Sequence, residues 1–207
     1  MKEKLILFPC NGNALEALDC INDTYELIGF VDDNVEKIST QVAGVTVYSR
    51  ALFNEFPEAK VLAVPGSPTS YSQRKEVITS LHIDKNRFIS LIHPSAIISK
   101  NADIGTNCLI MAGVIITSNA QLEDHVCVLP ATVIHHDSLI KAYTLIGFNV
   151  TIAGHTTIHE NCYIGSGSTI INTISIAPYT LVGIGSNVIR SIHQQRSKVG
   201  GNPARSL

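Results

Sequence analysis

The sequence contains little charge and no long apolar run. Only 15% of its 207 residues are charged and the formal net charge is −2, so electrostatics gives no basis for binding nucleic acid or an anionic membrane surface. No apolar run approaches the roughly 20 residues needed to span a bilayer. The N-terminal residues also lack the apolar core and the small-residue cleavage site of a signal peptide. We therefore expect a cytoplasmic protein with no membrane or nucleic-acid partner.

The sequence also lacks the C-x-x-C spacing of zinc and redox motifs. Its five cysteines are scattered along the chain, at Cys10, Cys20, Cys108, Cys127 and Cys162. We interpret them as reduced packing residues, which agrees with a cytoplasmic location.

The second half of the sequence has a period of six. A large aliphatic residue recurs at every sixth position without interruption, at Ile92, Ile98, Ile104, Ile110, Ile116, Leu122, Val128, Ile134, Ile140, Ile146, Ile152, Ile158, Ile164, Ile170, Ile176, Val182 and Val188. Most residues four positions after these are small. The period fits neither an α-helix nor an alternating strand, and it is typical of a hexapeptide β-helix.

In such a β-helix, three hexads form one triangular coil of about 18 residues, with the aliphatic residues along the axis. The repeat predicts about five to six coils, each stacked about 4.8 Å above the last. We predict this β-helix over residues 91–207.

Residues 1–90 show alternating strand and helix patterns. Apolar runs predict strands at 5–8, 27–31, 45–47 and 60–64 and a possible short one at 87–89; helical patterns cover 14–21, 50–55 and 71–81. This order predicts a small parallel sheet, which we interpret as a Rossmann-like domain over residues 1–90. Ligands of such sheets bind beyond the carboxyl ends of the strands.

Three loops of this first domain are candidate nucleotide contacts. The first contains Gly12 and Asn13, but it is not a G-x-G-x-x-G fingerprint, which argues against NAD. The second contains Asp32 and Asp33, about 20 residues after Gly12, the separation at which an acid reaches a ribose. The third contains Gly66. The alternative for the acidic pair is a solvated turn.

The cluster His135-His136-Asp137 occupies a turn of the repeat, where Gly, Asn or Ala would have sufficed. With coils of about 18 residues, His136 stacks on Gly154 and Asp137 on His155. An imidazole oriented by a carboxylate can remove a proton from an attacking amine or hydroxyl, and a backbone N–H beside a glycine can bind an oxyanion. These groups are suited to acyl transfer. His135 is an alternative to His136 as the base.

Two further features of the sequence bear on ligand binding. A γ-class carbonic anhydrase site would contain two histidines five residues apart, and this sequence has no such pair, so we expect no metal. The segment from Gly201 to Ala204 is, by chemistry alone, either a simple terminus or a ligand clamp.

Taken together, the chain resembles the bacterial sugar acyltransferases that join a small nucleotide-binding domain to a left-handed β-helix. These are the sialic acid O-acetyltransferases and the nucleotide-sugar 4-amino N-acetyltransferases of bacillosamine and perosamine pathways. The resemblance covers nearly the whole length. It rests on the hexads, on the junction segment 91–96 (LIHPSA), on His136-Asp137 and on the Gly-Asn-Pro-Ala ending.

The resemblance implies a left-handed coil and a homotrimer with acetyl-CoA in the groove between neighbouring prisms. It implies His136 as general base, Asp137 as its orienting acid and the Gly154 N–H as the contact of the thioester oxygen. The other implied contacts are with acetyl-CoA for His155, Gly201, Asn202, Pro203 and Ala204, and with the nucleotide-activated amino sugar for Gly12, Asn13, Asp32, Asp33 and Gly66.

Two departures from the family pattern bear on the substrate. The first loop reads Pro-Cys-Asn-Gly-Asn where the family usually has Gly-x-Gly-Gly-His or Gly-x-Ser-Gly-His. Leu129 and Leu145 stand where the family often has an Asn and a second His. We expect N-acetylation of the 4-amino group of a nucleotide-linked sugar, most simply a UDP sugar, in surface-glycan synthesis. The alternatives are O-acetylation of a sugar such as sialic acid, and a non-catalytic nucleotide-sensing or assembly trimer.

Overall fold

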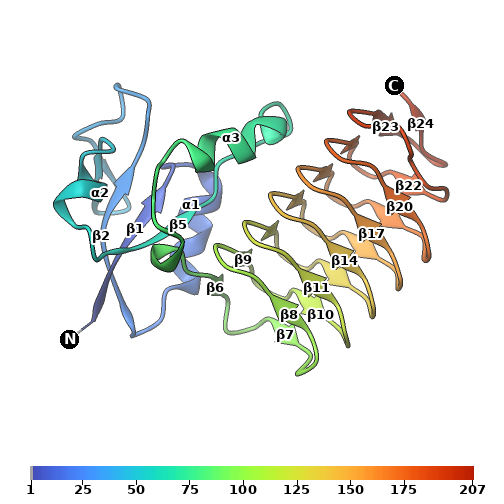
Figure 1. The fold of residues 1–207 in the computed structure, drawn as a ribbon, viewed down its shortest axis with the longest axis horizontal. Helices are drawn as coiled ribbons and strands as arrows, with labels where there is room; N and C mark the ends of the chain where they lie inside the picture. Colours follow the sequence, from blue (N-terminus) through green and yellow to red (C-terminus); the bar gives the residue numbers. More distant parts are fainter. Residues whose placement is uncertain (1) are drawn as a thin grey trace.

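A computed structural model describes residues 2–207; Met1, the first residue of the predicted first domain, lies outside the described residues. The N-terminal part forms a five-stranded sheet in the order β3-β4-β2-β1-β5 (Figure 1). Its strands are β1 (Glu3–Phe8), β2 (Tyr25–Val31), β3 (Gln41–Val42), β4 (Val45–Tyr48) and β5 (Lys60–Ala63). All pairs are parallel except β3 with β4.

The position of β1 brings the three candidate loops to one edge of this sheet. β1 lies between β2 and β5. After β1 the chain continues to β2 on one side of it, and after β4 it crosses to β5 on the other side. The loops that follow β1, β2 and β5 therefore meet at the carboxyl ends of parallel strands, where open sheets bind ligands.

The helices of this part are shorter than the sequence pattern predicted. They are α1 (Gly12–Glu16), α2 (Leu52–Glu55), α3 (Arg74–Thr79) and the 3-10 helices η1 (Ala17–Cys20), η2 (Tyr71–Gln73) and η3 (Lys85–Arg87). The predicted helix 14–21 is thus wrong in its bounds: the Asn11 side chain accepts the Ala14 N–H at 3.0 Å and starts α1 at Gly12. The predicted helix 71–81 is likewise split between η2 and α3.

The possible strand at 87–89 is a single bridge between Val61 and Phe88. The Ile89 N–H donates to the Val61 carbonyl, and two residues later Leu91 already pairs with the coil. The chain therefore leaves the sheet before a strand can form.

The rest of the chain forms a coil of short parallel strands that extends away from the sheet (Figure 1). The strands are β6 (Leu91–Ile92), β7 (Ile97–Ile98), β8 (Asp103–Ile104), β9 (Leu109–Ile110), β10 (Ile115–Ile116), β11 (Gln121–Leu122), β12 (Cys127–Val128), β13 (Val133–Ile134), β14 (Leu139–Ile140), β15 (Leu145–Ile146), β16 (Thr151–Ile152), β17 (Thr157–Ile158), β18 (Tyr163–Ile164), β19 (Thr169–Ile170), β20 (Ser175–Ile176), β21 (Leu181–Val182) and β22 (Asn187–Val188), followed by β23 (Lys198–Gly200) and β24 (Arg205–Ser206).

These strands make three faces. The first face contains β6, β9, β12, β15, β18, β21, β23 and β24; the second contains β7, β10, β13, β16, β19 and β22; the third contains β8, β11, β14, β17 and β20. Each strand pairs with the third strand after it, as in Ile116 with Ile134 and Ile134 with Ile152. The predicted hexapeptide β-helix and its 18-residue register are confirmed, and its left-handed sense stays a prediction.

The core of the coil is the aliphatic ladder. From Ile110 to Val188 these side chains are nearly fully buried, and they form one cluster with small residues that lie four positions after ladder residues, including Cys108 and Cys162. A fully buried aliphatic side chain contributes roughly 1.5–3 kcal/mol. The ladder therefore makes the coil a rigid support and leaves all chemistry to residues at its corners and on its surfaces.

The N-terminal sheet packs on the first face of the coil. Leu5, Leu7 and Leu62 of the sheet share a buried cluster with outward-pointing residues of that face, namely Leu91, Leu109, Cys127, Leu145 and Tyr163. The opposite side of the sheet packs on a separate cluster that contains Leu52, Phe53 and Ile78. Among residues 2–207, no helix has the length and apolarity required to cross a membrane.

A buried arginine joins the two parts of the chain. The Arg74 side chain is 1% exposed and donates to the carbonyls of Pro65, His125 and Tyr143. Burial lowers the pKa of its guanidinium. Because the three carbonyls come from both parts, Arg74 fixes the sheet against the corner of the coil.

Candidate active site

The His136-Asp137 pair lies at the corner between the second and third faces, between β13 and β14. This corner is opposite the first face, on which the N-terminal sheet packs. Asp137 adopts a left-handed backbone conformation with φ 58°, which Asp tolerates better than most residues. Its N–H donates to the Ser118 carbonyl in the preceding coil at 3.0 Å, so the turn is held in register.

A short hydrogen bond joins the two side chains. His136 Nδ1 lies 2.7 Å from Asp137 Oδ2, and both side chains are partly exposed. The hydrogen bonds from His136 and from Asn119 hold the pKa of the Asp137 carboxyl below its ordinary value. The carboxylate is therefore ionised at neutral pH and accepts the Nδ1–H of His136. This leaves the Nε2 lone pair of His136 available to accept a proton.

Gly154 provides the space for the His136 ring. A Cβ at position 154 would lie 2.8 Å from both Cε1 and Nε2 of His136, closer than real Cβ contacts come. The predicted stacking of Gly154 on His136 is thus what the structure shows. The Gly154 N–H has no acceptor within residues 2–207, so it is free to donate to an oxyanion beside the imidazole.

The two neighbouring histidines have different relations to this pair. The His135 ring lies edge-on to His136, with 4.4 Å between centroids. The centre of the His155 ring lies 5.1 Å from that of His136, and the Nε2 of His155 is 3.7 Å from Asp137 Oδ2. Asp137 makes its 2.7 Å hydrogen bond with His136, which favours His136 over His135 as the base.

His136, Asp137 and His155 could also approach a metal ion. One ligand atom from each of them lies within 4.8 Å of the others, and two imidazoles with a carboxylate form a set that zinc accepts. A metal bound to Nε2 of His136 would occupy the lone pair that a general base needs, and one bound to Nδ1 would displace the hydrogen bond to Asp137. Metal binding and the acid-base arrangement therefore exclude each other.

A groove on the second face leads from this corner to the C-terminal loop. A cavity of about 480 Å³ is lined by Ala153, which precedes Gly154, and by Ile171, Ile189 and Asn202. The Gly201 carbonyl accepts the Asn187 N–H, and the Ala204 N–H donates to the Asn187 carbonyl. The loop from Gly201 through Pro203 is thereby attached to the second face, the same face that ends at Gly154.

The acids of the second candidate nucleotide loop already have partners. Asp32 is 6% exposed; its Oδ1 accepts the Asn34 N–H at 2.8 Å and its Oδ2 pairs with Lys37 Nζ at 2.9 Å. Lys37 Nζ also donates to the Cys10 carbonyl of the first loop at 2.7 Å.

Asp33 binds Arg50 through two hydrogen bonds of 2.6 and 2.7 Å. Sequence reasoning missed both cations. Lys37 lies five residues beyond Asp32, where a paired cation could have been anticipated, whereas Arg50 comes from a separate segment.

The first and third loops are tied together at Val64. The side chains of Asn11 and Asn13 both donate to the Val64 carbonyl, at 3.2 and 3.5 Å. Gly12 has open space where a side chain would be, and Gly66 has φ +120°, a conformation that L residues rarely adopt. The structure thus brings the predicted nucleotide loops together, but at the sheet rather than at the His136 corner of the same chain.

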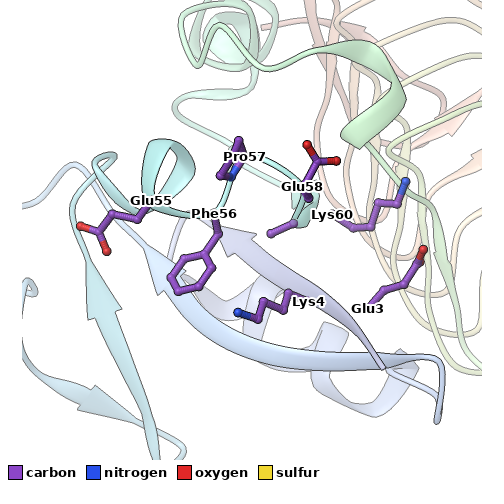
Figure 2. A pocket seen from close by; sticks show the side chains of 8 residues that line it. Glu3, Lys4, Glu55, Phe56, Pro57, Glu58 and Lys60 are labelled. Atoms are coloured by element: carbon purple, nitrogen blue, oxygen red, sulfur yellow. The ribbon is translucent and has the colours of Figure 1, made fainter. Parts of the chain in front are cut away.

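A further cavity, of about 520 Å³, lies at the other edge of the sheet (Figure 2). It is lined by residues at the amino ends of β1 and β5 and after α2, with Lys4 Nζ 4.2 Å from the centre of the Phe56 ring. No residue predicted to contact substrate or co-substrate lines it.

The GMPPB C-terminal domain family matches residues 88–196, which include the hexads and the His136 corner. The chain belongs to this family. A 41-residue segment is also 54% identical to the UDP-N-acetylbacillosamine N-acetyltransferase of Bacillus subtilis (strain 168). That segment covers 20% of this chain and only 19% of the length of this curated relative.

Solved structures match this GMPPB-family chain over its whole length. The acetyltransferase domain of PglB from Neisseria gonorrhoeae FA1090 is 26% identical, with a TM-score of 0.85 and 100% of both chains covered; it has also been solved with acetyl coenzyme A. PerB from Caulobacter crescentus, in complex with CoA and GDP-perosamine, is 23% identical, with a TM-score of 0.84 over 100% of this chain and 98% of that one, and shows the shared fold. These matches confirm the predicted resemblance to sugar N-acetyltransferases, a family of acyltransferases.

Proposed function

We propose that this protein transfers the acetyl group of acetyl-CoA to the 4-amino group of a nucleotide-linked sugar, with His136 as general base. The observation that carries the proposal is the His136-Asp137 hydrogen bond beside Gly154. It combines a proton acceptor, an orienting carboxylate and a free backbone N–H at one exposed corner. Acetyl-CoA is the ligand named for the gonococcal relative, and a nucleotide-linked amino sugar is the ligand named for PerB.

In the proposed reaction the unprotonated amine attacks the thioester carbon. His136 Nε2 takes a proton from the nitrogen as the tetrahedral intermediate forms, and the Gly154 N–H donates to its oxyanion. Asp137 stabilises the imidazolium through Nδ1. When the intermediate collapses, the C–S bond breaks and the imidazolium returns the proton to the leaving thiolate, so the products are the amide and CoA.

The co-substrate groove is proposed on the second face. Its floor of Ala153, Ile171 and Ile189 suits the pantetheine arm, and Asn202 of the C-terminal loop lines it. Gly201, Pro203 and Ala204 are the neighbours of Asn202 in that loop and are proposed as further contacts. His155, whose Nε2 lies 3.7 Å from Asp137 Oδ2, is proposed as a further contact of acetyl-CoA, as the resemblance implies.

The acceptor nucleotide is proposed to bind at the carboxyl edge of the Rossmann-like sheet. Gly12, Asn13 and Gly66 would contact it through backbone and amide groups. Asp32 and Asp33 would act together with the cations they bind, Lys37 and Arg50. A UDP sugar is our choice of acceptor because the curated relative acts in the UDP-N-acetylbacillosamine series.

The proposal includes a homotrimer, because the proposed nucleotide site and the His136 corner lie apart within one chain. The sheet packs on the first face, whereas His136 lies at the opposite corner, so a nucleotide held by one chain would present its amine to the His136 of a neighbour. The second face also carries exposed apolar side chains, with Ile97 65%, Ile171 42% and Ile189 47% exposed. Sedimentation as a monomer at assay concentrations would contradict this arrangement.

The test is release of CoA thiol from acetyl-CoA with a panel of acceptors. The panel contains UDP-, dTDP- and GDP-linked 4-amino sugars and free sialic acid. We expect turnover with a nucleotide-linked amino sugar and none with sialic acid; the reverse result would replace N-acetylation by O-acetylation. Turnover that survives EDTA excludes the metal arrangement of His136, Asp137 and His155, and turnover lost to EDTA and restored by zinc would establish it.

A further inference from the structure

Asp137 is held by the preceding coil as well as by its own. Its Oδ2 bonds His136, and its Oδ1 accepts the Asn119 Nδ2–H at 3.1 Å. Asn119 occupies the corresponding turn one coil before Asp137, at the same corner between the second and third faces. Both residues have the left-handed conformation, with φ 60° and 58°. The 18-residue register therefore stacks an amide directly on the carboxylate.

The two oxygens of Asp137 are thus assigned to different partners. Because Asn119 engages Oδ1, Oδ2 remains directed at His136 Nδ1. The Asp137 side chain is 35% exposed, so without this second contact water competes for both oxygens and the carboxylate can rotate. Rotation would release the Nδ1–H of His136 and allow the other tautomer, in which Nε2 carries the hydrogen and accepts no proton.

We propose that Asn119 is a positioning residue of the catalytic pair: it fixes Asp137 so that the carboxylate keeps His136 in the tautomer with a free Nε2. The proposal rests on the proposed function, in which His136 is the base. It also gives a role to a residue outside the positions that the family resemblance singles out. At the two positions where the family often has Asn and His, this chain has Leu129 and Leu145.

Other groups around Asp137 do not replace Asn119. His155 faces the same carboxylate, but its Nε2 lies 3.7 Å from Oδ2, the oxygen that already binds His136. His135 packs against the His136 ring and not on the carboxylate. The titratable groups that face the pair are thus His135 and His155, and neither donates to Oδ1.

The test compares Asn119→Gly with a matched control, Asn149→Gly. Both positions are exposed turns of the coil in the left-handed conformation, which glycine adopts without strain, and Asn149 lies at a different corner. We expect kcat of Asn119→Gly to fall by about five- to tenfold, with KM for acetyl-CoA unchanged, because one hydrogen bond to a charged group is lost. The control should keep kcat within twofold.

A double-mutant cycle separates positioning from a structural effect. In an Asp137→Asn background, Asn119→Gly should cause no further loss of kcat, because the carboxylate it orients is gone. A loss of the same size in both backgrounds would overturn the proposal.

The pH profile gives a second readout. Asn119→Asp places a second carboxylate against Asp137, so protonated His136 becomes more favourable and the acidic limb of kcat/KM should move to higher pH. Asn149→Asp should not move it. If the wild-type protein is active and Asn119→Gly behaves like Asn149→Gly, the positioning role is wrong; if the wild-type protein releases no thiol with any acceptor, the proposed function itself fails.

Discussion

Replacement of Gly154 by Ala should disable the base without unfolding the coil. The new Cβ would lie 2.8 Å from Cε1 and Nε2 of His136, whereas ordinary contacts begin at 3.4 Å, so the ring must withdraw by roughly 0.6 Å. Displacement of a catalytic group by about 1 Å can cost about 100-fold in rate. We therefore expect kcat to fall by about 10- to 100-fold.

Displacement of the His136 ring can be distinguished from two other effects, namely unfolding of the coil and loss of the oxyanion donor. The His136 side chain is 42% exposed and can swing into solvent, so the melting temperature should change little. The alanine retains the backbone N–H proposed to bind the oxyanion, so the loss reflects the position of the imidazole. Steady-state thiol release and thermal unfolding measure the two quantities.

The matched control is Gly183→Ala. A Cβ at Gly183 would meet its nearest atom, the Val199 carbonyl oxygen, at 3.4 Å, an ordinary contact distance. We expect this variant to keep kcat within about twofold. Retention of full kcat by Gly154→Ala would refute the reasoning, because it would mean that His136 works equally well when displaced.

Three further predictions concern stability. Arg74→Ala should lower the free energy of unfolding by about 3 kcal/mol or more in chemical denaturation, because three carbonyls lose a donor whose side chain is buried; a loss below 1 kcal/mol would contradict the joining role. Ile158→Ala, which empties a fully buried axial position, should cost about 2–5 kcal/mol in the same assay, and an unchanged midpoint would contradict the packing. Burial lowers the pKa of His125 to about 4, so the unfolded state binds the extra proton first. The free energy of unfolding should have its full value above about pH 6.5 and fall by up to about 3 kcal/mol towards pH 4. His125→Asn should flatten this part of the pH-stability curve, and an unaltered slope would be inconsistent with a partly buried neutral imidazole.

The coil could be predicted from the sequence because the hexad pattern that specifies it is local and repeated. Each hexad contributes one axial residue, so the positions of Ile134 and Ile152 fix the stacking of all residues between them. For that reason the contact between Gly154 and His136 followed from arithmetic on the sequence. Only the side-chain directions, such as Nδ1 of His136 towards Asp137, required coordinates.

The polar contacts between distant segments could not be predicted in the same way. Arg74 appeared in the sequence as one charged residue of a helix pattern, but its guanidinium is buried among carbonyls of both parts of the chain. Similarly, Asp33 gave no indication of Arg50, and Asn119 was one small polar turn residue among several. Such contacts depend on how the sheet and the coil pack, and no local pattern encodes them.

The most direct test of the account is single-turnover thiol release by His136→Asn, measured with the acceptor that the wild-type protein uses. His82→Asn is the control, since His82 is exposed, has a positive φ that Asn tolerates, and lies outside the site. If His136 is the general base, its replacement should slow the chemical step by about 100- to 10,000-fold at neutral pH, while the control keeps the wild-type rate and both proteins remain folded. A His136→Asn protein that transfers acetyl groups at the wild-type rate would contradict the central claim.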